Sequence, residues 1–167
     1  MKNIILASQS PRRKELLALL DIEFTVEVRE VDEVFPDDLV ATEVAEYLAK
    51  LKASAFTNIT DEQLIITADT VVVLDNKILG KPKNKAESTQ MLQSLSNRSH
   101  RVITGVCIKT CDKTISFSNT TKVYFKELTA SEIDYYIENY KPFDKAGSYG
   151  IQEWIGAIGI TKIEGSY

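Results

Sequence analysis

A long run of β-favouring residues, LIITADTVVVLDNKIL, occupies residues 64–79 near the middle of the chain. Isoleucine, valine and leucine dominate the run, and Asp75-Asn76 supplies a turn before a short second strand. Segments with helical spacing and further strand-like runs intermix on both sides of it. This order predicts an α/β fold with a mixed sheet and flanking helices. A length of 167 residues suits one domain with room for two lobes.

The N-terminal segment predicts a strand, a helix and a second strand. Residues 4–7 form a short apolar run. Ser10 is a good N-cap, and Pro11 suits the first position of the helix that follows. Apolar residues recur along this helix at the spacing of one face, at Leu16, Leu17 and Leu20. Residues 22–29 alternate between apolar and polar side chains, which predicts a half-buried strand.

Three later segments predict helices with defined N-termini. Thr42 is expected to cap a helix with an apolar face and Lys52 at its margin. Asn84 with Glu87, and Thr129 with Glu132, match the spacing of a capping box. The expected buried positions are Val44, Tyr47, Leu48, Leu51 and Ala55 in the first helix, Met91, Leu92 and Leu95 in the second, and Ile133, Tyr136, Ile137 and Tyr140 in the third. A late strand is expected over residues 157–163.

Three cations in the first turn of a helix, Arg12, Arg13 and Lys14, are unusual. Positive charge at a helix N-terminus costs about 0.3–1 kcal/mol, so an anion is expected among them. Backbone N–H groups, two guanidinium groups and the hydroxyls of Ser8 and Ser10 can surround a phosphate. Without ligand, the fold should then be no less stable when Arg13 is replaced by alanine. The alternative is a solvated basic turn paired with nearby acids.

Asp69 is an acidic residue inside an aliphatic run, where an uncompensated carboxylate is very costly to bury. It either binds a partner or a metal, or it bonds backbone amides at the end of a strand. Solvation is the commoner explanation for Lys81, a lone lysine in a loop, and for Lys52 at the margin of a helix face, and a substrate anion is the alternative for both. An acidic loop around Glu33 supplies mostly surface charge, from which one carboxylate can reach a metal.

Composition excludes several classes of function. The net charge of −4 argues against a nucleic-acid partner. No apolar run approaches the roughly 20 residues of a membrane helix, and none resembles a secretory signal, so we expect a cytoplasmic protein. Cys107 and Cys111 are expected to be reduced structural thiols. With His100 as the single histidine, a zinc enzyme is not expected, and a metal should be Mg²⁺ or Mn²⁺ held by carboxylates and phosphates.

Six segments in order resemble the Maf family of nucleoside triphosphate pyrophosphatases: SxSPRR, LKA, ADTVV, GKP, HxVxTGV and DKAGxYGIQ. The resemblance covers Ile4 to Tyr167 and implies one Maf-like domain over residues 1–167, a twisted sheet and two lobes around a central cleft. One departure is that the chain stops at IEGSY, where family members continue through a strand and a short GLP-containing segment.

The resemblance implies hydrolysis of a nucleoside triphosphate to the monophosphate and pyrophosphate. Within the family, the chain is most similar to the members that prefer dTTP and UTP, and Arg12, Thr70 and Gln152 fall at their specificity positions. Modified pyrimidine nucleotides are further candidate substrates. The family also implies a homodimer, arrest of cell division with inhibition of septum formation, and clearance of modified nucleotides. A non-catalytic nucleotide-binding regulator of division and a truncated inactive relative are the alternatives.

With this chemistry, roles are expected for each candidate residue. Ser8, Ser10, Arg12 and Arg13 hold phosphate oxygens, while Lys52 and Lys81 neutralise charge. Glu33 and Asp69 hold Mg²⁺ or Mn²⁺, and Asp69 also accepts the proton of the attacking water. Thr70 and Gln152 recognise the base.

Overall fold

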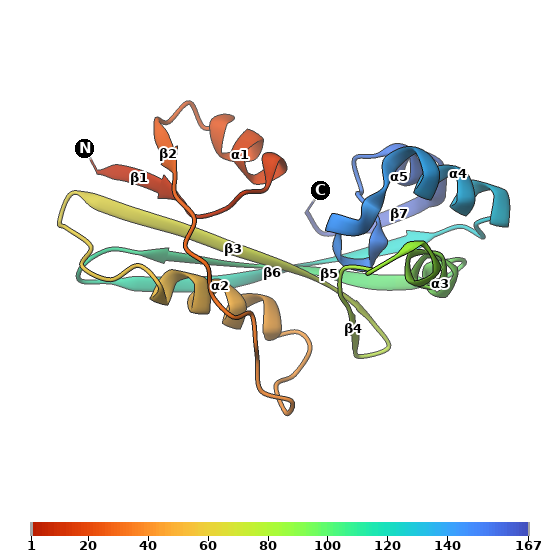
Figure 1. Ribbon diagram of the computed structural model, residues 1–167, viewed down its shortest axis with the longest axis horizontal. Helices are drawn as coiled ribbons and strands as arrows, with labels where there is room; N and C mark the ends of the chain where they lie inside the picture. Colours follow the sequence, from red (N-terminus) through yellow and green to blue (C-terminus); the bar gives the residue numbers. More distant parts are fainter. Residues whose placement is uncertain (1, 167) are drawn as a thin grey trace. The chain divides into compact units, whose positions relative to one another are not determined.

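Figure 1 shows the computed structural model, which describes residues 2–166. The strands are β1 (Asn3–Leu6), β2 (Phe24–Val26), β3 (Gln63–Leu74), β4 (Lys77–Leu79), β5 (Ser99–Lys109), β6 (Thr114–Phe125) and β7 (Ile160–Glu164). The α-helices are α1 (Pro11–Ala18), α2 (Val44–Ser54), α3 (Lys85–Leu95), α4 (Ala130–Tyr140) and α5 (Trp154–Gly159). Two short 3₁₀ helices, η1 (Pro142–Asp144) and η2 (Ala146–Ser148), lie between α4 and α5.

The strands form one sheet in the order β2-β1-β3-β5-β6-β7, with β4 paired to β3. Strand β1 is parallel to both neighbours, so that Leu6 stands opposite Val26 of β2 and Ile66 of β3. The β3–β4 and β6–β7 pairs are antiparallel. This combination of parallel and antiparallel ladders confirms the predicted mixed α/β fold.

The chain divides into two compact units, and β3, β5 and β6 each contribute to both. Unit 1 comprises the residues up to Asp69 together with Thr104–Ser118. One buried cluster of unit 1 consists of Ile5, Ala7, Phe56 and Ile65. A second consists of Ala49, Ala53 and Cys107. Unit 2 comprises Thr70–Ile103 and the residues from Asn119 onward. Its larger core is Val72, Leu74, Leu92, Leu95, Phe125, Leu128, Ile133, Tyr136, Ile137, Tyr149 and Ile155.

Several local predictions are confirmed. Asp75 and Asn76 both have positive φ, 48° and 64°, as a two-residue turn between β3 and β4 requires. Thr129 and Glu132 form a complete capping box at α4. At α3 the Asn84 side chain accepts from the Glu87 N–H, but the Glu87 carboxylate bonds the N–H of Lys83, so the box is only half formed.

The first helix forms where it was predicted, with Pro11 as its first residue. Ser10 occupies the N-cap position, and its side chain makes no capping hydrogen bond. No residue of α1 is buried: Leu16 is 59% exposed and Leu17 is half-buried, while Leu20, which follows the helix, is 65% exposed. Helical spacing fixes which residues share a face, whereas burial requires a partner element over that face.

Other boundaries also differ from the predictions. Strand β2 covers three residues at the edge of the sheet, and Val26 and the following Val28 are exposed. Helix α2 has Glu43 rather than Thr42 at its N-cap. Residues 157–159 belong to α5, so the last strand begins at Ile160.

Two further predictions concern thiols and the membrane. Cys107 is buried and Cys111 is exposed, and both are free thiols. Within residues 2–166, no helix combines the length and apolar character that a membrane crossing needs.

Candidate functional site

The pairing of β1 with β3 brings the first loop beside the middle of β3. The ladder continues past β1 through a bond from Ala7 N–H to the Ile66 carbonyl, at 2.8 Å. The next residue, Ser8, is buried, and its Oγ accepts the N–H of Ser10 at 3.2 Å. A short parallel ladder therefore holds the hydroxyl of Ser8 close to Ala68 and Asp69.

Arg13 reaches from the first turn of α1 to this part of β3. Its Nη1 donates to the Ala68 carbonyl at 2.8 Å and to Ser8 Oγ at 3.3 Å. Burial lowers the pKa of the Arg13 guanidinium, and the negative charge of Asp69 opposes that shift. Because the bond to Ala68 joins residues 55 positions apart, these contacts predict that Arg13→Ala destabilises the empty fold, whereas the sequence predicted a fold no less stable.

Lys52 joins the two carboxylates that were predicted to bind metal. Its ammonium lies 2.6 Å from Asp69 Oδ1 and 3.0 Å from Glu33 Oε1. The Lys52 and Asp69 side chains are only 18% and 12% exposed, whereas Glu33 is half exposed. Asp69 is thus paired, which satisfies the requirement for compensating a carboxylate among aliphatic residues.

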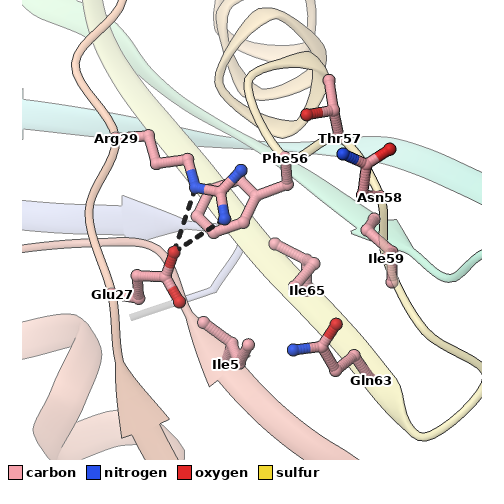
Figure 2. Close-up of a pocket in the computed structure, with 9 residues that line it drawn as sticks. All are labelled: Ile5, Glu27, Arg29, Phe56, Thr57, Asn58, Ile59, Gln63 and Ile65. Atoms are coloured by element: carbon pink, nitrogen blue, oxygen red, sulfur yellow. Dashed lines mark hydrogen bonds and ion pairs between the residues drawn. The ribbon is translucent and has the colours of Figure 1, made fainter.

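The acidic loop that carries Glu33 is held at its start by Arg29, a residue to which the sequence assigned no role. Figure 2 shows the Arg29 guanidinium over the ring of Phe56, 4.4 Å from its centroid, and paired with Glu27. Arg29 Nη1 also donates to the Ala55 carbonyl at 3.0 Å. Only the tertiary structure identifies this anchor, because Ala55 and Phe56 lie at the end of α2, far from Arg29 in the sequence.

The hollow drawn in Figure 2 has a volume of about 280 Å³. Its lining combines the Glu27–Arg29 pair with Ile5, Ile65 and the segment after α2. None of the predicted site residues lines it. The hollow is therefore separate from the group formed by Ser8, Arg13 and Asp69.

The structure brings together only some of the predicted residues. Ser8, Ser10, Arg13, Glu33, Lys52 and Asp69 are linked by the contacts above, all within unit 1. Arg12 is exposed on α1. Burial lowers the pKa of Arg13, and the charge of Arg12 lowers it further by a smaller amount. Thr70, Lys81 and Gln152 belong to unit 2.

Within unit 2, Lys81 and Gln152 are exposed and Thr70 is half-buried. Gly80, which precedes Lys81, accepts the Gly147 N–H at 3.1 Å. Gln152 lines a second hollow of about 280 Å³, otherwise formed mainly by Ile151, Ile160, Ile163 and the small residues of α5. Glu153 also lines this hollow. A mostly apolar hollow with a few polar groups is typical of small-molecule sites.

The carboxylates Glu33 and Asp69 suit a divalent cation in donor type. In the described part of the chain, no group of three or more His, Cys, Asp or Glu residues is placed to hold a metal. Mg²⁺ commonly takes one or two carboxylates and completes its coordination with water and substrate phosphates. Both carboxylates already face the Lys52 ammonium, and the charge of Arg13 acts on both as well. The pair therefore fits a hard divalent ion that shares its coordination with a phosphate ligand.

His100 is buried with 2% exposure and is not part of this group. Its Nε2 lies 2.6 Å from the Tyr149 hydroxyl, and its ring stacks on Phe125. Burial lowers the pKa of His100 to about 4. His100 is therefore a neutral residue of the core of unit 2.

The family model described as "Maf-like protein" matches residues 3–167. The chain belongs to the Maf family. Among its relatives, the dTTP/UTP pyrophosphatase of Flavobacterium psychrophilum is 55% identical over 98% of this chain and 85% of its own length. The dTTP/UTP pyrophosphatase of Phocaeicola vulgatus is also 55% identical, over 98% of this chain and 86% of its own.

Solved structures with a similar fold include two Ham1 proteins. The Ham1 protein of Staphylococcus aureus has a TM-score of 0.55 and 17% identity, covering 74% of this chain and 72% of its own. The HAM1 protein of Coxiella burnetii has a TM-score of 0.50 and 19% identity, over 75% and 73% of the two chains. At these identities, the similarity concerns the fold.

Proposed function

We propose that this protein hydrolyses dTTP and UTP to the nucleoside monophosphate and pyrophosphate. The names of relatives that are 55% identical over nearly the whole chain support this activity. The structural observation that carries the proposal is the Lys52 ammonium between Asp69 and Glu33, with Arg13 and Ser8 beside them. Basic groups and paired carboxylates in one place suit a polyphosphate substrate and its cation.

The basic residues hold the triphosphate. Arg12 and Arg13 bind phosphate oxygens, with the hydroxyls of Ser8 and Ser10 as further hydrogen-bonding groups. Lys52 and Lys81 neutralise the negative charge that grows on the leaving group. The contact of Arg13 with the Ala68 carbonyl orients its guanidinium before the nucleotide arrives.

Asp69 accepts the proton of the attacking water. The water oxygen forms a bond to the α-phosphorus, and the bond from that phosphorus to the α–β bridging oxygen breaks. Pyrophosphate leaves with the electron pair. Glu33 and Asp69 hold a divalent cation, Mg²⁺ or Mn²⁺, which supplies charge neutralisation to the phosphate oxygens. Lys52 orients Asp69 through their ion pair until the substrate and its cation bind.

Base selection falls to Arg12, Thr70 and Gln152. The Gln152 amide carries both a donor and an acceptor, which match the N3–O4 edge of uracil or thymine. Its position at an apolar hollow supports a role in holding a planar base.

The proposal has a wider setting. A net charge of −4 favours a small nucleotide over a nucleic-acid partner. We also propose that the protein acts in the cytoplasm as a single-domain homodimer, without a membrane partner. Its proposed cellular roles are inhibition of septum formation and removal of modified pyrimidine nucleotides.

Pyrophosphate release from dTTP and UTP, with Mg²⁺ or Mn²⁺, tests the activity directly. Asp69→Asn keeps the size of the side chain and removes the base, so turnover should fall by roughly 10²–10⁴-fold while nucleotide affinity survives. Wild-type protein that binds these nucleotides without releasing pyrophosphate would instead be a regulator or an inactive relative. Near-normal turnover of Asp69→Asn would exclude Asp69 as the base.

A further inference from the structure

Gln152 lies in a tight turn that spans Gly150 to Glu153. The Glu153 N–H donates to the Gly150 carbonyl at 3.0 Å, which leaves Ile151 and Gln152 as the two central residues. Gln152 itself is exposed. The direction of its amide therefore depends on how firmly the two ends of the turn are held.

A single hydroxyl group, that of Tyr136 on α4, bonds both ends of this turn. The Gly150 N–H donates to Tyr136 Oη at 3.0 Å, and the same hydroxyl donates to Glu153 Oε2. A phenol can accept one hydrogen bond and donate another, so the two contacts are compatible. Tyr136 is fully buried at 0% exposure. Its hydroxyl is thus a fixed point from which both ends are held.

Lys145 holds the same carboxylate from the other side. Its Nζ lies 3.2 Å from Glu153 Oε1, and its side chain is only 10% exposed. The Glu153 side chain folds back over Gly150, where a Cβ would come within 2.8 Å of the Glu153 Cδ. The absence of a side chain at Gly150 therefore allows the carboxylate to reach both Tyr136 and Lys145.

We infer that Tyr136 is a positioning residue for base selection, which acts through the turn that presents Gln152. This inference rests on the proposed function, since it assumes that Gln152 recognises the base. Tyr136 does not touch the nucleotide. It holds the backbone of the turn from which the Gln152 side chain projects, together with Glu153 and Lys145. We call these three residues the clamp.

Tyr136→Phe removes one oxygen atom and keeps the ring, and Tyr135→Phe is the matched control on the same helix. Tyr135 is half exposed, and its ring contact with Trp154, at 4.7 Å, survives the change. The readout is kcat/KM for UTP relative to ATP, with inhibition by inorganic tripolyphosphate as a measure of phosphate binding alone. Exchange of the Gly150 amide with deuterium, followed by NMR, reports on the clamp itself.

In Tyr136→Phe, the preference for UTP over ATP should fall by roughly 2- to 12-fold, the loss expected when Gln152 no longer makes one net hydrogen bond to the base. The tripolyphosphate inhibition constant should stay unchanged, and the Gly150 amide should exchange faster. Tyr135→Phe should match the wild type in all three. Glu153→Gln, which keeps an acceptor for Tyr136, should retain more of the preference than Glu153→Ala.

Three outcomes would overturn the inference. An unchanged Gly150 exchange rate would mean that Tyr136 does not hold the turn. Faster exchange with an unchanged preference would mean that the turn does not set base selection. An equal loss with UTP, ATP and tripolyphosphate would indicate a general structural role. A wild-type enzyme with turnover but no preference for UTP would refute the role of Gln152 in the proposed function, and the inference with it.

Discussion

Replacing Lys52 by methionine tests whether the Lys52 ammonium compensates the buried carboxylate of Asp69. Methionine keeps most of the length and apolar stem of lysine and removes the charge. In the wild type, the ammonium lies 2.6 Å from Asp69 Oδ1 and 3.0 Å from Glu33 Oε1. Asp69 is 12% exposed and cannot regain its full hydration, whereas Glu33 is half exposed and can.

The expected loss in the free energy of unfolding comes mainly from Asp69. Removing one partner of a buried ion pair costs about 3–5 kcal/mol. Glu33 adds no more than the roughly 0–1 kcal/mol of an exposed pair. Arg13, whose charge interacts with Asp69, offsets part of the loss, so we expect about 2–3 kcal/mol in total. For a chain of this size, that corresponds to a fall in Tm of roughly 4–12 °C.

Urea unfolding without nucleotide or divalent cation measures this loss. Lys50→Met is the matched control on the same helix, because Lys50 is 53% exposed and pairs with Glu46 four residues earlier, at 2.9 Å. That exposed pair should contribute no more than about 0.5 kcal/mol. Added Mg²⁺ should narrow the gap between Lys52→Met and the wild type, since a cation at Glu33 and Asp69 replaces the lost charge.

Equal losses in Lys52→Met and Lys50→Met would refute the argument that Asp69 depends on Lys52. A large loss of stability in Lys52→Met that Mg²⁺ does not reduce would support the role of the ion pair. It would also contradict the assignment of the two carboxylates as a cation site.

Three further predictions concern Arg13, Gln152 and His100. Arg13→Ala should lower the free energy of unfolding by about 1–2 kcal/mol in urea, because the lost bonds to Ala68 and Ser8 outweigh the relief at the helix N-terminus; an unchanged midpoint would restore a purely anion-binding role. Gln152→Ala should lower kcat/KM for UTP and dTTP by roughly 2- to 12-fold more than for ATP, and equal losses would mean that the amide does not recognise the base. The pKa of His100 is about 4 in the fold and near its ordinary 6.5 when unfolded, so below pH 6.5 the unfolded chain takes up a proton that the fold excludes. Wild-type stability should therefore fall by up to about 1.4 kcal/mol per pH unit more than that of His100→Gln between pH 6.5 and 4, and parallel curves would contradict this.

The amino-acid sequence alone determined the features that depend on neighbours within a few residues. The capping box of Thr129 and Glu132 and the turn at Asp75-Asn76 form as predicted, because their hydrogen bonds and backbone angles are local. The apolar spacing of α2 likewise identified Val44 and Leu48 as buried, whereas Tyr47, Leu51 and Ala55 of the same predicted face are only half-buried. The ordered segments also indicated the family, because they specify residue types along the chain.

Tertiary structure alone decided which residues are buried and which of the candidate residues meet. Leu16 and Leu20 have helical spacing, yet they remain exposed because burial depends on the elements that cover a face. Arg13 meets Ala68 across 55 positions, and Lys52 meets Asp69 across 17, because the β1–β3 ladder and the packing of α2 bring them together. Tyr136 holds the turn around Gln152 for the same reason: a contact between distant segments requires the whole fold, and no local pattern in the sequence encodes it.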